Sequence, residues 1–279
     1  MREEITVEQV IEYLKKNDVR FIDLHFTDVL GKLHHITVTS DYMDVKSFEE
    51  GVPKLDGSSI KGFAEIHNSD MVLKPDPSTF ALIPWHDNSR KTGRMICDVY
   101  KGYGGGRSTR DPRYVAQKAE AYLREFGYDF SYWGPEVEFF VFDKVYWDVS
   151  NPSRGMCYYL ESREAPWSSG NDAQSYPIRF KEGYFPTPPQ DTLMDYRSEV
   201  CKILREYFNI SVDAHHHEAA TAGQCEIDLR YDTLVKMADN VQTYKYVAKN
   251  VAKQMGLIAT FMPKPLYGDN ASGMHVHIS

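Results

Sequence analysis

The segment Trp133-Gly134-Pro135-Glu136-Val137-Glu138-Phe139-Phe140-Val141-Phe142 combines a strand-like pattern with two acidic residues. Its aromatic and β-branched residues predict a strand within 129–143. Side chains alternate between the faces of a strand, so Glu136 and Glu138 would share one face and Val137 the other. Two adjacent carboxylates in a poorly solvated place share a proton or hold a cation. A strand with a hydrated polar face is the alternative, and this segment alone does not exclude it.

Two later segments favour a bound cation over a hydrated polar face. Residues 220–223, Ala-Thr-Ala-Gly, predict a turn between two antiparallel strands within 211–231, so Glu218 and Glu226 would approach each other across the ladder. A last predicted strand, 273–279, carries His275 and His277 at same-face spacing. A single histidine is more often a structural residue than a ligand, but four glutamates and several histidines together predict a site for Mg²⁺ or Mn²⁺ rather than zinc.

The rest of the chain alternates between helical and strand patterns, which predicts an α+β protein. Thr6 and Gln9 have the spacing of a capping box and predict a helix after Thr6. The segments 19–26 and 32–38, on either side of a turn at 28–31, predict a hairpin. Further helices are predicted at 112–127 after the Asp111 N-cap, at 191–208, and at 232–255 before Gly256.

A glycine-rich run divides the chain. Gly102 and the three glycines 104–106 lack the GxxxxGK[ST] phosphate-loop pattern and precede a polar connection, which is typical of a linker. We therefore expect a domain boundary near residue 105, with domains at 1–105 and 106–279.

Composition excludes several classes of function. The 279 residues carry a formal net charge of −8, without the basic stripe that binds a nucleic-acid backbone. No apolar run approaches the roughly 18 residues of a membrane span, and the charged N-terminus is unlike a signal peptide, so we expect a cytoplasmic protein with neither nucleic-acid nor membrane partners. The four cysteines are far apart and form no CxxC pair, which argues against a zinc site or a disulfide framework.

Six motifs together resemble the type I glutamine synthetase family, in its order and at its spacing. They are Asp56-Gly57-Ser58-Ser59-Ile60, Asn68-Ser69-Asp70-Met71-Val72-Leu73, Gly134-Pro135-Glu136-Val137-Glu138-Phe139-Phe140, Gly183-Tyr184-Phe185 with Pro188-Pro189, His216-His217-Glu218 through Glu226, and Asn270-Ala271-Ser272-Gly273-Met274-His275-Val276-His277. The resemblance implies an N-terminal β-grasp domain followed by a catalytic domain of curved antiparallel strands with helices. It also implies that the C-terminal part of the catalytic domain is absent from these 279 residues.

The resemblance implies a site for each reactant. The residues that it assigns are Glu138, Glu218 and Glu226 for a first metal, Glu136 and His275 for a second, Asp213, Tyr231, His277 and Ser279 for ATP, Asn270 and Ala271 for glutamate, and Asp56, Ser59 and Tyr184 for ammonium. Two of them depart from the family pattern, since Ala271 replaces a glycine and Asp213 replaces a frequent glutamate. Without the resemblance, the segment Asp-Gly-Ser-Ser at 56–59 would predict only a turn.

The implied reaction is the ATP-dependent ligation of ammonia to L-glutamate through γ-glutamyl phosphate, which assimilates nitrogen. Two or more Mg²⁺ or Mn²⁺ ions per site would serve as cofactors. The implied partners are further copies of the same chain, in a homododecamer of two hexameric rings whose active sites lie at subunit interfaces.

Two alternatives stay open. A related enzyme that ligates glutamate to an amine such as a polyamine would use the same metals, although Asp56 and Tyr184 suit a small ammonium pocket better. A non-catalytic metal-binding assembly subunit would keep the fold without the chemistry. We also expect residues 1–279 alone to be inactive, because Glu136 and His275 would hold the second ion with only two protein ligands.

Overall fold

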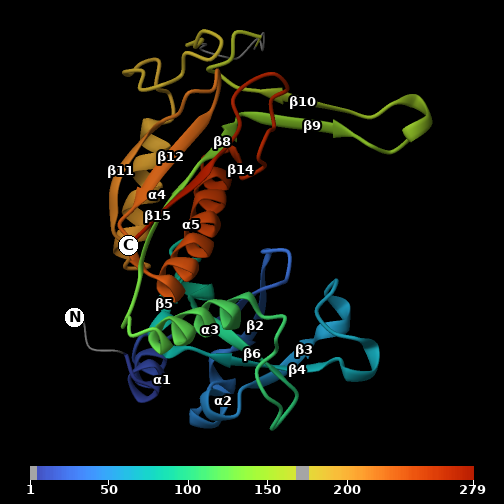
Figure 1. The fold of residues 1–279 in the computed structure, drawn as a ribbon, viewed down its shortest axis with the longest axis vertical. Coiled ribbons are helices and arrows are strands. Elements are labelled where there is room, and N and C mark those ends of the chain that lie inside the picture. The colour runs from blue at the N-terminus through green and yellow to red at the C-terminus, as the bar shows by residue number, and fades with distance from the viewer. Residues whose placement is uncertain (1–4, 168–175) are drawn as a thin grey trace. The chain divides into compact units, whose positions relative to one another are not determined.

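The computed structural model describes residues 5–167 and 176–279 (Figure 1). These form two compact units: residues up to Ser131 together with Leu234–Asp239, and Tyr132–Thr233 together with Asn240–Ser279. The predicted boundary near residue 105 stays a prediction. Within the described ranges, every helix is too short or too polar to cross a membrane.

The N-terminal unit is a mixed sheet with helices. Its helices are α1 (Val7–Lys16), α2 (Val45–Glu49) and α3 (Pro112–Glu125). Its strands are β1 (Phe21–Thr27), β2 (Leu33–Thr39), β3 (Val52–Asp56), β4 (Asp70–Pro75), β5 (Ala81–Leu82) and β6 (Thr92–Lys101). Its short 3₁₀ helices are Ser40–Tyr42, Gly57–Ser59, Ile66–Asn68, Pro77–Thr79 and Asn88–Arg90. The sheet order is β2-β1-β6-β4-β3, with β5 paired to β6. Strand β1 is antiparallel to β2 and parallel to β6.

Local sequence explains the first elements of this unit. The predicted capping box at the start of α1 is confirmed: Thr6 Oγ1 accepts from the Gln9 N–H, and the Gln9 side chain accepts from the Thr6 N–H. The predicted hairpin is also confirmed, with Phe21 opposite Thr39. Ile22 and Leu24 on one face of β1 belong to a buried apolar cluster that includes Met95 of β6.

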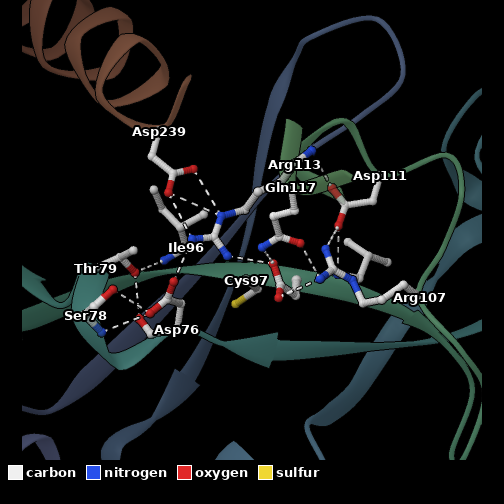
Figure 2. A network of polar contacts seen from close by, with 12 residues as sticks. Asp76, Ser78, Thr79, Ile96, Cys97, Arg107, Asp111, Arg113, Gln117 and Asp239 are labelled. Atoms are coloured by element: carbon white, nitrogen blue, oxygen red, sulfur yellow. Dashed lines mark hydrogen bonds and ion pairs between the residues drawn. The ribbon is translucent and has the colours of Figure 1, made fainter. Parts of the chain in front are cut away.

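A network of charges joins helices to the sheet within this unit (Figure 2). The Arg113 guanidinium of α3 donates to carboxylates of Asp76 at 2.6 Å, Asp98 at 2.6 Å and Asp239 at 3.0 Å. Arg107 donates to Asp98 and to the α3 N-cap Asp111. Because Arg113 is nearly buried, it depends on these partners for its charge to be tolerated.

The second unit is built on an antiparallel sheet. Its helices are α4 (Met194–Glu206) and α5 (Leu234–Gln254), and the first residues of α5 belong to the N-terminal unit. Its strands are β7 (Tyr132–Val137), β8 (Phe139–Phe142), β9 (Lys144–Asp148), β10 (Cys157–Glu161), β11 (Val212–His217), β12 (Gln224–Leu229), β13 (Asp232–Thr233), β14 (Ile258–Thr260) and β15 (Met274–Ile278). A 3₁₀ helix spans Pro152–Arg154. The sheet order is β13-β7-β12-β8-β14, with β11 paired to β12 and β15 to β7. Strands β9 and β10 form a separate hairpin (Figure 1).

Aromatic side chains fill the core behind this sheet. Phe139 of β8 contacts the rings of Tyr196 in α4 and Tyr244 in α5. The Tyr244 hydroxyl donates to the Val137 carbonyl at 3.1 Å, and the Tyr196 hydroxyl donates to the Ala248 carbonyl at 2.8 Å. These buried contacts fix the strands from which the acidic side chains project.

Two predicted elements differ in detail. The single strand expected within 129–143 is two strands, β7 and β8, which separate at Glu138. There the Glu138 N–H donates to the Gly273 carbonyl at 3.2 Å. The helix expected from Asp191 begins at Met194, after a turn at 192–193, and the Asp191 carboxylate forms an ion pair with the buried Arg197 at 2.6 Å. The predicted α+β class is confirmed.

Candidate active site

Three neighbouring strands of the second unit bring Glu136 together with the terminal histidines. The register places both His275 of β15 and Asp228 of β12 opposite Glu136 of β7. His275 Nδ1 lies 3.4 Å from one Glu136 oxygen, and His277 Nε2 lies 2.8 Å from the other. Glu136 and His275, predicted to hold one metal, are therefore neighbours.

The β11–β12 hairpin presents a second group of acidic side chains. Glu226 lies directly opposite His216, and Glu218 follows two residues after His216, where its N–H donates to the Gln224 carbonyl at 2.9 Å. Glu218 is therefore diagonal to Glu226 across the ladder. His216 Nδ1 lies 3.5 Å from Glu218 Oε1.

Like charges converge at this hairpin. Burial, followed by contact with Asp228 and the charges of Glu218 and Glu138, raises the pKa of Glu226 to about 8. Burial also raises the pKa of Glu138, with Glu218 and Glu136 adding to the effect. Carboxylates that repel one another in a poorly hydrated place are stabilised by a cation.

The donors at this place fit a hard divalent cation. Ligand atoms of His216, Glu226 and Asp228 all lie within 4.8 Å of one another. The Oδ1 atom of Asp228 is buried without a hydrogen-bond partner among the described residues. Carboxylate oxygens with few imidazoles are the donors that Mg²⁺ and Mn²⁺ accept.

A hollow of about 460 Å³ is lined in part by the acidic strands β7, β12 and β15. Its lining includes Glu136 and all four residues predicted to bind ATP: Asp213, Tyr231, His277 and Ser279. The Tyr231 ring contacts Tyr132 edge to face, with centroids 5.1 Å apart. The four predicted residues therefore share one cavity with a predicted metal ligand.

A second hollow, of about 390 Å³, contains the residues predicted to bind glutamate. Its lining comprises Glu138, Lys181, Glu218, Gln224, Lys264, Asp269, Asn270 and Ala271. The Gln224 amide joins two sides of this hollow, because Nε2 donates to Glu138 Oε2 at 2.6 Å and to the Ala271 carbonyl at 3.0 Å. Asn270 and Ala271 thus line the same hollow as two predicted ligands of the first metal.

The residues predicted to bind ammonium belong to different units. In the N-terminal unit, Asp56 accepts hydrogen bonds from the side chains of Ser58 at 2.6 Å and Ser59 at 2.9 Å. These bonds lower the pKa of Asp56, which keeps its carboxylate charged. In the second unit, the exposed Tyr184 ring stacks on Phe185 with centroids 4.0 Å apart.

Sequence reasoning missed several polar residues of the second unit. Asp228 follows Glu226 by two positions, so the alternation rule applied to Glu136 and Glu138 could have found it. Gln224, which precedes Glu226 by two positions, could have been found in the same way. Glu164, which is buried against His217, lies in a loop outside any periodic segment, and no sequence signal marks it.

The N-terminal unit has a donor cluster of its own. Ligand atoms of Asp23, His25 and His35 lie within 4.8 Å of one another. Burial, followed by the charge of Arg94, lowers the pKa of His25 well below its usual value. The same buried Arg94 guanidinium would oppose a divalent cation, so we assign no metal to this cluster.

Comparison with known proteins identifies the family. The family model "Glutamine synthetase, catalytic domain" matches residues 109–279, and "Glutamine synthetase, beta-Grasp domain" matches residues 18–102. Sulfolobus acidocaldarius glutamine synthetase is 54% identical over 97% of this chain and 56% of its own length. A Cupriavidus pinatubonensis 3-hydroxylaminophenol mutase is 46% identical over 98% of this chain and 58% of its own length.

A solved structure agrees with these matches. Plasmodium falciparum glutamine synthetase superposes with a TM-score of 0.88 at 30% identity, over 98% of this chain and 53% of that chain. The chain therefore spans little more than half the length of the relatives that it matches. Both family models and the shared fold show that the chain belongs to the glutamine synthetase family.

Proposed function

We propose that the protein of which these residues form part ligates ammonia to L-glutamate with ATP, through γ-glutamyl phosphate. One observation supports this above the others: acidic side chains of one sheet line two hollows. Glu136 lines the hollow that contains the predicted ATP residues, and Glu138 lines the hollow that contains Asn270 and Ala271. Such a sheet could hold a nucleotide phosphate close to a substrate carboxylate, as phosphoryl transfer requires.

In this proposal the acidic residues hold two or more Mg²⁺ or Mn²⁺ ions. Glu138, Glu218 and Glu226 would hold one ion, while Glu136 and His275 would contribute to a second. Bound there, the ions would supply Lewis-acid stabilisation of negative charge on the carboxylate and phosphate oxygens. The raised pKa values of Glu138 and Glu226 support this assignment, because a bound cation would offset the burial and the repulsion that raise them.

Other side chains would orient the substrates. The exposed Tyr231 ring offers an apolar face for the adenine base. His277, held against Glu136, and Ser279 at the end of the chain would contact the nucleotide together with Asp213. The Asn270 loop would hold glutamate, and the Gln224 amide would fix that loop to Glu138.

Asp56, Ser59 and Tyr184 would receive ammonium. The lowered pKa of Asp56, caused by its bonds to Ser58 and Ser59, keeps the carboxylate anionic and attractive to NH₄⁺. A carboxylate with a low pKa is a weak base, so we assign to Asp56 cation binding more than proton removal. From the family resemblance, we propose that this site forms where chains of a homododecamer meet, in the cytoplasm.

A chimera tests this function. Residues 1–279 would be joined to the remaining C-terminal part of the Sulfolobus acidocaldarius relative and supplied with ATP, glutamate, Mg²⁺ or Mn²⁺ and ¹⁵N-ammonium. We expect ¹⁵N-glutamine from the chimera and no phosphate release above background from residues 1–279 alone. Putrescine and 3-hydroxylaminophenol would be offered in parallel. Turnover of either one without glutamine formation would contradict the proposal, and ATP binding without any turnover would favour the assembly-subunit alternative.

A further inference from the structure

A buried acid–imidazole pair lies beside the proposed metal ligands and has no role in the chemistry described so far. Glu164 is completely buried, and His217 is 1% exposed. Oε2 of Glu164 lies 2.9 Å from Nε2 of His217. A buried charged pair is costly unless its remaining hydrogen-bonding capacity is also used, so the other partners show what the pair does.

Glu164 accepts hydrogen bonds from three segments. The Gly223 N–H donates to Oε2 at 2.9 Å, on the same oxygen that faces His217. The Thr192 N–H and hydroxyl donate to Oε1 at 3.1 Å and 2.7 Å. One carboxylate therefore joins the turn between β11 and β12, the end of β11, and the segment that precedes α4.

His217 extends the connection to the proposed site. Its Nδ1 lies 2.7 Å from the carbonyl oxygens of both Gly183 and Glu218. Carbonyl and carboxylate oxygens only accept, so this geometry uses both ring nitrogens as donors. Gly183 immediately precedes Tyr184, and Glu218 is a proposed metal ligand, so one ring holds the backbone at both places.

The backbone around this ring is closely packed. A Cβ at Gly183 would lie 2.0 Å from the Ala220 carbonyl, 2.7 Å from the Glu218 carbonyl and 2.9 Å from the His217 ring. The 183–185 loop can therefore approach the hairpin only because residue 183 is glycine and because the His217 imidazole donates to its carbonyl. The approach depends on the orientation of the His217 ring, which Glu164 fixes.

We propose that Glu164 and His217 are positioning residues that hold the Glu218 backbone and the Tyr184 loop in place for metal and ammonium binding. The proposal rests on the function proposed above, in which Glu218 binds a metal. Neither residue needs to touch a substrate. Residues that orient metal ligands typically change metal affinity by about 10- to 100-fold when they are replaced.

Two measurements on residues 1–279 test the pair. The first is a Mn²⁺ titration followed by the electron paramagnetic resonance of free Mn²⁺. The second is the rate of trypsin cleavage after Lys181, an exposed residue that lies just before the held loop and reports on it without metal. The variants are Glu164→Gln, His217→Gln and the double variant, with Asp239→Asn in the N-terminal unit as a control that weakens another buried ion pair.

We expect Glu164→Gln and His217→Gln each to weaken Mn²⁺ binding about tenfold and to speed cleavage after Lys181. The double variant should bind Mn²⁺ no more weakly, and be cleaved no faster, than the more strongly affected single variant, because the two residues act as one unit. Asp239→Asn should lower the melting temperature without changing either readout.

Unchanged cleavage in both single variants, or equal acceleration in Asp239→Asn, would overturn the positioning role. Fully additive effects in the double variant would also contradict it. If the unmodified chain bound no Mn²⁺, the proposed function would fail, whereas the cleavage rates would still decide whether the pair holds the loop.

Discussion

Asp228 of β12 lies directly opposite Glu136 of β7. This register connects the strand that carries Glu226 to the strand that carries Glu136, so the two groups of proposed ligands belong to one continuous patch of negative charge. Such a patch opposes folding when no cation is bound, and function accounts for its presence better than stability does.

Replacing Asp228 should therefore stabilise the metal-free chain. Asp228→Asn removes one negative charge beside Glu226 and keeps the side-chain volume. We expect the free energy of unfolding in a chelator to increase by about 1 kcal/mol, as measured by urea denaturation. The conservative control is Asp148→Asn on the exposed β9 strand. A stabilised control or a destabilised Asp228→Asn variant would show that repulsion is not the dominant effect.

Gly223 should not tolerate a side chain. It has φ +72°, and a Cβ would lie 2.2 Å from the Val141 carbonyl oxygen. Gly127 has a similar φ of +83° with nothing within 4 Å, so Gly127→Ala isolates the backbone strain of about 1–2 kcal/mol. Gly223→Ala should cost about 1–3 kcal/mol more because the strand must move. If urea denaturation showed equal losses of unfolding free energy for Gly223→Ala and Gly127→Ala, the backbone near Val141 would have to move aside at no cost.

His25 should make the N-terminal unit sensitive to acid. Burial, then the charges of Arg94 and His35, lower its pKa well below the usual 6.5, so the folded chain keeps the imidazole neutral. Asp23 also faces this cluster. In the unfolded chain His25 takes up a proton below about pH 6.5, so stability is independent of this group above that pH and is lost as the pH falls.

The slope for one such proton is about 1.4 kcal/mol per pH unit. His25→Gln should therefore flatten the decline in unfolding free energy between pH 6.5 and 5. The matched control is His67→Gln at an exposed position, which should leave the decline unchanged. Identical pH profiles for His25→Gln and the unmodified chain would rule out this role.

Asp56 should affect amide formation more than carboxylate phosphorylation. In the chimera, Asp56→Ala removes the anion that would attract ammonium but leaves the proposed metal ligands intact. We expect glutamine formation to fall by about tenfold or more, while glutamate-dependent phosphate release in the absence of ammonia changes little. Asp41→Ala, at an exposed position of the same unit, is the control. Equal loss of both activities would indicate that Asp56 only stabilises its turn.

The sequence predicted those features that depend on local pattern. The capping box at Thr6, the hairpin after Phe21 and the turn before Gln224 were all found because each is encoded within a few residues. The two strands that separate at Glu138 were not found, because the separation depends on different neighbours: β15 pairs with β7, and β14 pairs with β8.

The same limit applies to the candidate site. The alternation of strand side chains identified Glu136 and Glu138, and it could also have identified Asp228. Glu164 could not be found in this way, because the four hydrogen bonds of its carboxylate come from residues 28 to 59 positions away in the chain. The ligand roles themselves stay predictions, since they come from the family resemblance and the geometry supports but does not test them.

A Mn²⁺ titration of residues 1–279 and the Glu226→Gln variant tests the central claim most directly. The account predicts saturable Mn²⁺ binding by the unmodified chain and at least about tenfold weaker binding by Glu226→Gln, with little loss of melting temperature, because a neutral amide replaces an anionic ligand. Glu161→Gln, on the β9–β10 hairpin, should bind Mn²⁺ as the unmodified chain does. Equal Mn²⁺ affinity in Glu226→Gln and the unmodified chain would contradict the assignment of these strands as a metal site.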